Sequence, residues 1–379
     1  MVQNEAAARF RQLFPQFASE ADRLAHYARM RHERPIAGSP ETGFWSVYRY
    51  EDVRRVLTDH HAFSSEFAAE GGFLRRTLLN SDPPRHTELR GLVTRAFTPR
   101  AVERMAPLIG RLTQQSLEPA LRRGSMEVTG ELARPLPIGI IAAMLGLPTE
   151  DEPRFRVWSE AFNGSGEQRF QGMQEEMDAY FRPLLQRQQG EGLVADLVRA
   201  ELAGEDLLAF CELLLLAGFV TTTNLIGNGM WLLSQHPEVL PRLRADPSRV
   251  PAFVEEVLRI ASPVQAFVRR AAREVSIAGA TIPADARVLA WIGSANLDKD
   301  AFADADRFLP DRDPNPHLAF GHGIHFCLGA PLARLEGRIA FAEVAQRVAT
   351  ITGPEQEPAF TPGFLHGPTR LDVQLAAVR

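Results

Sequence analysis

Residues 320–329 read Phe-Gly-His-Gly-Ile-His-Phe-Cys-Leu-Gly, and this stretch decides both the fold and the chemistry of the chain. Its glycines allow unusual backbone angles and let the main chain approach a flat ligand closely. Cys327 lies where nearby backbone N–H groups stabilise a thiolate, the form of cysteine that binds metals. Residues 330–336 begin a helix with Pro331 in its first turn, and the positive end of that helix faces the sulfur. The stretch therefore has the layout needed to hold a thiolate under the iron of a haem.

A lone cysteine beside a glycine-rich loop is ordinarily a buried apolar residue, and composition decides against that reading here. The chain has 23 Phe, 28 Gly, 10 His and 2 Cys among 379 residues. At these frequencies a chance match anywhere in the chain has an expectation of about 10⁻⁶. The six positions that matter are Phe320, Gly321, Gly323, His325, Cys327 and Gly329.

The segment resembles the haem-binding signature of the cytochrome P450 family, and the resemblance extends from about Glu41 to the C-terminus. It implies a mainly α chain with the cytochrome P450 fold, a helix-rich triangular prism with small β-sheets. Haem b, iron protoporphyrin IX, is expected between a long central helix and the cysteine loop. Residues 1–379 are expected to form a single domain, because no internal repeat, low-complexity tract or long Gly/Ser linker divides them.

Composition indicates a soluble globular protein. Hydrophobic residues make up 45% and charged residues 23% of the chain, and the net charge of −5 favours neither nucleic acid nor an anionic membrane as partner. Two cysteines cannot build a disulfide framework and suit a reducing cytoplasm. Residues 1–24 lack the apolar core of a signal peptide or anchor. We therefore expect a cytoplasmic monomer that binds neither nucleic acid nor membrane.

Hydrophobic periodicity predicts mostly helices. The longest helix runs from about Gly204 to Gln235, where Pro237 stops it, and its apolar residues lie on nearly all faces, as in a helix through a protein centre. Strands are few, and a helix is expected over 50–57. The predicted strands are 44–48, 287–291 and 371–375, and residues 275–282 are expected to form a hairpin or a bend.

The middle of the central helix carries small and hydroxyl residues. Their structural interpretation is helix packing with hydroxyls bonded to the preceding turn. The resemblance implies instead that Ala217 and Thr221 face the haem and that Thr221 helps to activate oxygen. Thr221 and Cys327 are thus the predicted catalytic residues, and Cys327 is the predicted iron ligand.

One departure from the family pattern concerns the supply of protons. The family usually reads Ala/Gly-Gly-x-Asp/Glu-Thr-Thr, whereas residues 217–222 here read Ala-Gly-Phe-Val-Thr-Thr. Val220 stands at the acid position and cannot carry a proton. The substrate could supply a hydroxyl or carboxylate, or water held by Thr221 and Asn224 could suffice; these two are favoured. Alternatively, the enzyme uses peroxide, which arrives with its protons.

Haem carries two propionates, and the planar guanidinium fork of arginine suits a carboxylate. His86 and Arg90 are four residues apart and share one helical face. The resemblance places His86, Arg90, Arg269 and His325 at the propionates, with Arg270 as the competitor of its neighbour. The full set of expected cofactor contacts is His86, Arg90, Ala217, Thr221, Arg269, Phe320, Gly321, His325, Cys327 and Gly329.

Glu256 and Arg259 are three residues apart on one helical face. Such a pair is ordinarily a surface ion pair of little value. The resemblance assigns it to a buried structural network behind the haem, near the segment 306–312.

The substrate pocket is expected to be apolar. By resemblance its candidates are Phe73, Leu74, Leu78, Ala217, Val220, Val264, Phe267 and Phe364, each of which could equally be ordinary core. Because no flavin or ferredoxin domain is fused to the chain, electrons are expected from a separate ferredoxin and ferredoxin reductase. A basic patch suited to an acidic ferredoxin would comprise Arg95, Arg100, Arg334 and Arg338.

The sequence thus predicts a haem-thiolate monooxygenase that uses O2 to hydroxylate or otherwise oxidise a small organic molecule, plausibly in specialised metabolism. Val220 motivates one alternative, oxidative coupling or peroxide-driven oxidation. The other alternative is a haem-binding interaction module without turnover.

Overall fold

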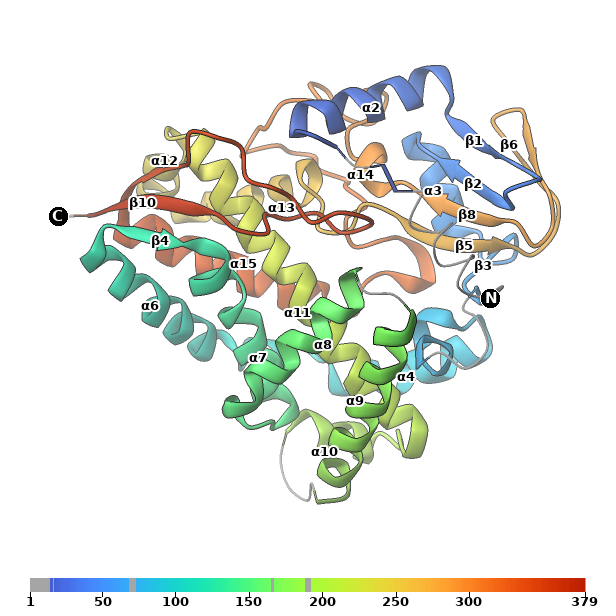
Figure 1. Ribbon diagram of the computed structural model, residues 1–379, viewed down its shortest axis with the longest axis horizontal. Coiled ribbons are helices and arrows are strands. Elements are labelled where there is room, and N and C mark those ends of the chain that lie inside the picture. The colour runs from blue at the N-terminus through green and yellow to red at the C-terminus, as the bar shows by residue number, and fades with distance from the viewer. Residues whose placement is uncertain (1–13, 16, 68–72, 165–166, 188–191, 379) are drawn as a thin grey trace.

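The predicted central helix is α11, Gly204–Gln235, and the other helices pack around it. The computed structural model describes residues 14–15, 17–67, 73–164, 167–187 and 192–378 (Figure 1). By length and hydropathy α11 could cross a membrane, but 78% of its most apolar stretch is buried inside the molecule. Its apolar character is therefore explained by its place in the core.

A close crossing joins α11 to helix α15, Ala330–Arg347, which begins three residues after Cys327. Gly229 of α11 meets the ring of Phe341 of α15 so closely that a Cβ at residue 229 would overlap the ring. The absence of a side chain at Gly229 thus sets the spacing of the two helices between which the resemblance places the haem.

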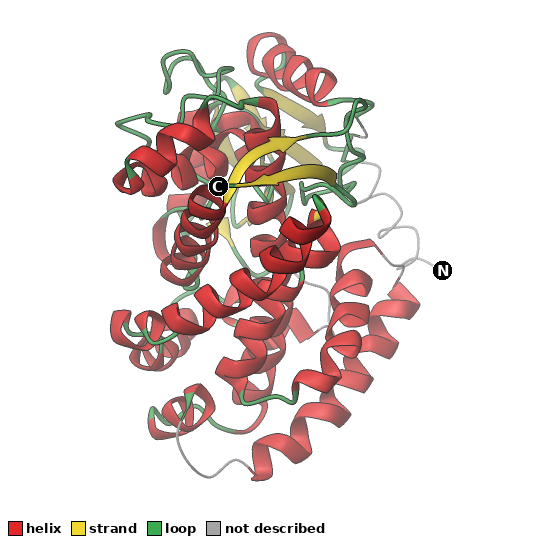
Figure 2. Ribbon diagram, turned by 90° about the vertical axis from the view of Figure 1, so that its left-hand side faces the viewer, coloured by secondary structure: helices red, strands yellow, loops and turns green. Residues whose placement is uncertain are grey.

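Helices α6, α7, α8, α9 and α10 occupy the lower part of Figure 1, whereas the largest sheet lies at the upper right beside α2, α3 and α14, and β4 and β10 lie at the left. Figure 2 shows the strands in the upper half of the molecule and helices filling the lower half. The other α-helices are α2 Glu20–Glu33, α3 Tyr50–Thr58, α4 Arg85–Ala96, α5 Pro99–Glu103, α6 Ala106–Arg123, α7 Pro135–Leu145, α8 Glu152–Gly164, α9 Glu167–Arg187, α10 Leu193–Arg199, α12 Val239–Ala245, α13 Val250–Ile260 and α14 Ile292–Ala295. Short 3₁₀ turns are η1 Phe73–Arg76, η2 Leu78–Asn80, η4 Thr149–Asp151, η5 Pro247–Arg249 and η6 Gly323–His325, and η3 Thr129–Ala133 is a π-helical turn.

The strands form three small sheets. They are β1 Ile36–Ser39, β2 Phe44–Val47, β3 Phe63–Ser64, β4 Ser125–Glu127, β5 Phe267–Ala271, β6 Val275–Ile277, β7 Ala280–Ile282, β8 Arg287–Ala290, β9 Val348–Thr352 and β10 Asp372–Ala377. The largest sheet has the order β1-β2-β8-β5-β3, in which only the β2–β8 pairing is parallel among the described strands. The second has the order β4-β10-β9, and β6 and β7 form the predicted hairpin. Strands β1, β3, β4, β5 and β9 were not among those predicted.

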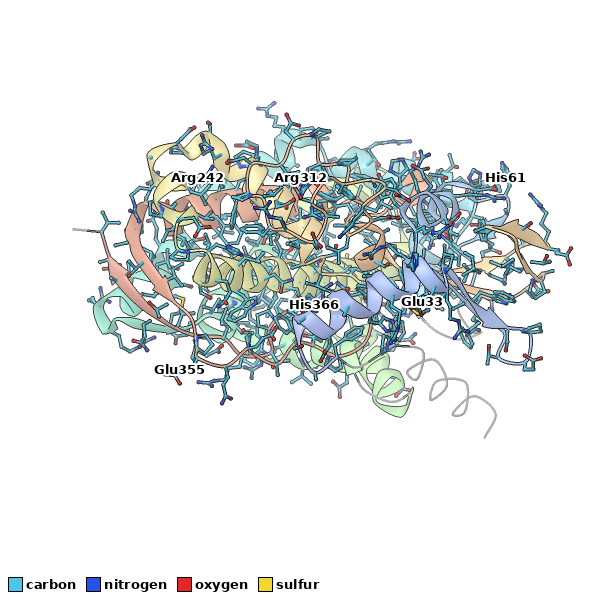
Figure 3. All side chains as sticks on the ribbon, turned by 90° about the horizontal axis from the view of Figure 1, so that it is seen from above. Glu33, His61, Arg242, Arg312, Glu355 and His366 are labelled. Carbon is cyan, nitrogen blue, oxygen red and sulfur yellow. The ribbon has the colours of Figure 1, made fainter. Side chains whose placement is uncertain are left out.

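The Glu256–Arg259 pair on α13 is completely buried. Arg259 donates to both Glu256 oxygens at 2.7 and 2.8 Å and to the carbonyls of Asn296, Ala305 and Arg307. Arg312 donates to the same carboxylate at 3.0 Å. Figure 3, seen from above, places Arg312 near the middle of the molecule. The predicted contact with segment 306–312 is therefore present, and the pair is internal and not on the surface.

A second charged cluster joins η1, α9 and α11 through ion pairs. Arg76 of η1 donates to Glu205 of α11 and, at 3.4 Å, to Asp178 of α9. It lies 3.9 Å from the carboxylate of Glu212, which is 1% exposed. Arg182 binds Glu205 at 2.6 Å from the same side. Burial, and after it the neighbouring Asp178 carboxyl, raises the pKa of Glu212 to about 9.

Replacing Glu212 by glutamine is expected to stabilise the protein at alkaline pH. The unfolded chain ionises Glu212 above about pH 4.5, whereas the folded chain keeps it protonated to about pH 9. The unfolded state therefore binds fewer protons in this interval, and stability falls as pH rises. Glutamine mimics the protonated acid, so E212Q should gain about 5 kcal/mol over wild type at pH 8 and nothing at pH 4.

Urea unfolding followed by circular dichroism at several pH values measures this difference. The matched control is E205Q, which removes a carboxylate from the same cluster at a site that is 53% exposed. Burial does not force that carboxyl to stay protonated, so no gain at high pH is expected from it. Parallel pH profiles for wild type and E212Q would show that Glu212 is ionised in the folded protein.

Candidate functional site

The loop around Cys327 is a tight turn closed by backbone hydrogen bonds. The amide of Cys327 donates to the carbonyl of Phe320 at 2.9 Å, and that of Gly321 donates to Leu318 at 2.8 Å. Gly321 and Gly323 have φ values of +70° and +73°, which favour glycine. A Cβ at residue 323 would lie 2.9 Å from the carbonyl oxygen of Leu57 in α3. These glycines are therefore required by backbone geometry and by close packing.

The thiol of Cys327 is reached by solvent although it lies deep among protein atoms. That burial raises the pKa of Cys327, while the backbone N–H groups of Gly329 and Ala330 and the guanidinium groups of Arg90 and Arg334 act to lower it. Gly329 is the N-cap of α15, so the helix start faces the sulfur as predicted. A bound metal cation adds the stabilisation that a thiolate still needs here.

Basic side chains converge beside this loop, and none of them forms an ion pair among the described residues, although Asp82 lies near enough to act on His86 and Arg269. The rings of His86 and His325 are 4.2 Å apart. His86 Nε2 and both ring nitrogens of His325 are buried and have no hydrogen-bond partner among the described residues. Among the described residues, neither Arg90 nor Arg269 forms an ion pair. The Arg269 guanidinium donates one hydrogen bond there, to the carbonyl of Val268.

Burial and neighbouring positive charge shift the pKa values of these groups. Burial, followed by Arg269, His86 and Arg90, lowers the pKa of His325 to about 3. Burial lowers the pKa of Arg269 to about 10. Buried cations and unsatisfied donors at such density are costly unless anionic oxygens pair with them. The cluster thus fits a ligand that carries two carboxylates, which is what haem presents.

The structure separates the two candidate arginines of β5. Arg269 is 7% exposed and points to the side of His325 and Asp82. Arg270 points to the opposite face and pairs with Asp285 at 2.8 Å. Side chains alternate along a strand, so only one of the two can face the cluster. Geometry therefore favours Arg269.

The middle of α11 is accessible where the sequence predicts a cofactor contact. Ala217 is exposed and Thr221 half-buried, although most of this helix is fully buried. Thr221 donates from its hydroxyl to the carbonyl of Ala217 at 2.7 Å. Val220 is buried, and Asn224 Nδ2 is buried without a hydrogen-bond partner among the described residues. The bond of a hydroxyl to the preceding turn is present, and the same hydroxyl lies on the accessible face.

The substrate candidates fall into two groups. The side chains of Phe73 and Leu74 lie outside the described residues. Leu78 and Val220 are buried, whereas Val264, Phe267 and Phe364 are partly exposed, as side chains that line an opening are. The segment around Phe364 is fixed: Gln265 N donates to the carbonyl of Phe364 at 2.7 Å.

The loop around Phe364 is anchored further by His366, which lies 3.1 Å from Glu20 at the start of α2. The carbonyl of His366 accepts from Asn228 of α11 at 3.0 Å. Figure 3 shows His366 beside α2. The loop therefore rests on both the central helix and the N-terminal helix.

The expected basic patch is only partly available. Arg95, Arg100 and Arg338 are exposed. Arg334, however, donates both arms of its guanidinium to Glu255 at 2.8 Å and lies 4.5 Å above the ring of Phe320. Arg334 thus packs against the cysteine loop, and its charge is already paired with Glu255. Spacing along the sequence gave no sign of this pairing.

Sequence reasoning also missed His60, which follows α3. It lies close enough to lower the pKa values of His86 and His325, after burial and the nearby arginines. Its Nδ1 is buried without a partner in the described part of the chain. The signal in the sequence was the adjacent pair His60-His61 directly after a helix. It cannot be interpreted until the fold places α3 beside the cysteine loop.

Comparison with known proteins agrees with this geometry. The family model of Cytochrome P450 matches residues 146–375. Cytochrome P450 109 of Bacillus spizizenii is 37% identical, over 97% of this chain and 96% of its own length. The Erythromycin C-12 hydroxylase of Saccharopolyspora erythraea is 38% identical, over 89% of this chain and 90% of its own length.

Among solved structures, that of cytochrome P450 CYP109Q5 from Chondromyces apiculatus superposes with a TM-score of 0.88 at 37% identity, covering 95% of this chain and 96% of that one. The expected fold is therefore confirmed, and so is the haem, which this family carries. The chain belongs to the cytochrome P450 family, and its activity is that of a haem-dependent monooxygenase.

Proposed function

We propose that this enzyme oxidises a small or medium-sized organic molecule of specialised metabolism, and that the Cys327 thiolate would hold the iron of haem. The observation that carries the proposal is the accessible thiol of Cys327 beside a buried basic cluster whose imidazole nitrogens have no hydrogen-bond partner among the described residues. When bound, haem supplies the chemistry: one atom of O2 enters the substrate and the other leaves as water, with two electrons and two protons consumed.

The protein's own residues hold the cofactor by two means. The turn that carries Cys327 is fixed by glycine geometry and by Arg334 over Phe320, so the sulfur has one position. His86, Arg90, Arg269 and His325 bind the propionates. Charge-assisted hydrogen bonds of this kind are about twice as strong as neutral ones, which offsets the burial of so many cations.

Thr221 would relay protons toward the side of haem at which O2 binds. Its hydroxyl donates to the carbonyl of Ala217 and can accept a hydrogen bond from water at the same time. The unpaired Nδ2 of Asn224, one helical turn further on, suits a second contact for such a water. A hydroxyl or carboxylate on the substrate completes the relay that Val220 cannot serve.

The valine at residue 220, where the family usually has an acid, also bears on the class of substrate. The relative from Saccharopolyspora erythraea is described as an erythromycin hydroxylase, and macrolides carry many hydroxyl groups. An apolar wall that includes Leu78, Val264, Phe267 and Phe364 suits the carbon frame of such a molecule.

Electrons come from a separate ferredoxin and its reductase. The exposed Arg95, Arg100 and Arg338 attract an acidic partner, whereas the paired Arg334 adds little. We place the enzyme in the cytoplasm as a monomer of one domain spanning residues 1–379. The ordinary composition, the small number of cysteines and the burial of α11 support this placement.

Replacing Val220 by aspartate tests how protons are supplied. On a substrate without a hydroxyl near the reacting carbon, wild type is expected to waste most electrons as hydrogen peroxide. V220D restores an acid at this position and should raise the yield of product per NADPH at least about tenfold, since a positioned general acid contributes 10²–10⁴ in rate. V220N, which matches aspartate in size but carries no titrating proton, is the control.

The measurement counts product, NADPH and hydrogen peroxide, with ¹⁸O2 to trace the oxygen atom. One ¹⁸O in a product formed with NADPH, ferredoxin and reductase supports the monooxygenase reaction. Val220 also favours a second candidate, oxidation driven by peroxide. Faster turnover of wild type on hydrogen peroxide than on the redox partners would select it, and dimeric products without ¹⁸O would select oxidative coupling.

A further inference from the structure

Two adjacent histidines follow helix α3 and differ in their surroundings. The rings of His60 and His61 lie 4.2 Å apart at 37° to one another. His61 is exposed and lies at the right-hand side of Figure 3. His60 is partly buried, and its Nδ1 is out of contact with solvent and has no hydrogen-bond partner among the described residues. The pair therefore presents one ring to solvent and turns a nitrogen of the other inward.

Packing holds the end of α3 against the cysteine loop. Helix α3 contacts η6, the turn that ends in His325. A Cβ at Gly323 would lie 2.9 Å from the Leu57 carbonyl oxygen and 3.1 Å from Thr58 Cα, so the two backbones touch. The amides of Ala62 and Phe63 both donate to the carbonyl of Asp59, which fixes the turn that carries His60. The position of His60 beside η6 is thus set by backbone contacts.

His60 lies close to the basic cluster, and none of the described acids forms an ion pair or hydrogen bond with its ring. His60 acts electrostatically on both His86 and His325, as Arg90 and Arg269 do. The nearby carboxylate is that of Asp82, which accepts a hydrogen bond from the amide of Ser65 at 2.9 Å. Four buried imidazole nitrogens of three histidines therefore lack partners at one place. Two carboxylates offer several acceptor positions, more than the two arginines alone can fill.

We propose that His60 is a further haem-binding residue, which donates a hydrogen bond from Nδ1 to a propionate carboxylate. The proposal rests on the presence of haem in this family and adds a residue outside the set predicted from the sequence. His60 reaches the cofactor from α3, whereas His86 and Arg90 reach it from α4, Arg269 from β5 and His325 from the cysteine loop. The hydrogen bond would therefore couple the position of α3 to the presence of haem.

Haem retention and reduction potential test the proposal without any substrate. Loss of one charge-assisted hydrogen bond should speed the transfer of haem from the holoenzyme to excess apomyoglobin about tenfold in His60→Ala. The uncompensated propionate charge should also shift the ferric/ferrous midpoint potential to a more negative value, because negative charge stabilises the ferric state. His60→Gln keeps a side-chain N–H donor and should restore most of both properties.

His61→Ala is the matched control, since it removes the stacked ring and leaves the inward nitrogen in place. It should lose haem at the wild-type rate and keep the wild-type potential. Equal effects of His60→Ala and His61→Ala would assign them to ring stacking and overturn the proposal. Haem loss from His60→Gln as fast as from His60→Ala would also overturn it, because donor and non-donor would then behave alike. Haem loss at the wild-type rate together with the wild-type potential in His60→Ala would overturn the proposal as well.

Discussion

Serine in place of Cys327 is expected to abolish oxygen-dependent turnover, with a loss of at least about 1,000-fold, because the thiolate is what drives O–O cleavage. The reduced protein with carbon monoxide should also lose the Soret band typical of a thiolate ligand. The basic cluster and the apolar wall do not depend on the sulfur, so the variant should still fold. Difference spectroscopy and product analysis of the same preparation measure both effects.

Cys211 supplies the internal control, because it is the other cysteine of the chain. It lies fully buried in α11, where burial raises the pKa of its thiol to about 12. C211A should keep the thiolate spectrum and the turnover. A thiolate-type band that persists in C327S, or disappears in C211A, would contradict the assignment of the iron ligand.

Methionine in place of Arg259 is expected to cost about 3–5 kcal/mol of stability, because removal of one partner leaves a buried charge uncompensated. In this variant the Glu256 carboxylate keeps Arg312 but loses its two shortest bonds, at 2.7 and 2.8 Å. The carbonyls of Asn296 and Ala305 lose their donor as well. Urea unfolding of the holoenzyme, followed by circular dichroism, measures the loss.

The neighbouring pair of Glu255 and Arg334 gives a matched comparison. Its side chains are 27% and 33% exposed, so water compensates either charge when the other is removed. R334M should therefore cost about 1 kcal/mol or less. R259K should fall between the two, because lysine keeps the charge but not the planar fork. Equal losses for R259M and R334M would refute the view that burial sets the importance of the pair.

Sequence reasoning succeeded where the signal is local. Helix α11 was predicted with its observed bounds because apolar residues run along it and Pro237 follows it. The turn at Cys327 was predicted because each glycine has a backbone reason that does not depend on distant residues. Strands β3 and β4 were missed because they have only two and three residues. Strands β1, β5 and β9 were missed because apolar and polar residues do not alternate regularly along them; β5 contains Arg269 and Arg270 side by side.

Residues that act through tertiary contacts could not be found in this way. The pairing of Arg334 with Glu255 joins residues 79 positions apart. His60 becomes meaningful only when α3 packs on the cysteine loop, and a lone histidine after a helix has no periodicity or spacing to mark it. Arg269 and Arg270 could not be separated from the sequence because the alternation of side chains depends on where the strand begins.

The anchoring of Phe364 has a consequence for biosynthesis. Its loop rests on Glu20 and on Asn228, both of which precede it in the chain, and it follows the cysteine loop by more than thirty residues. During synthesis the chain therefore completes the cysteine loop before it makes the segment around Phe364. Cofactor capture can thus precede closure of the ligand chamber.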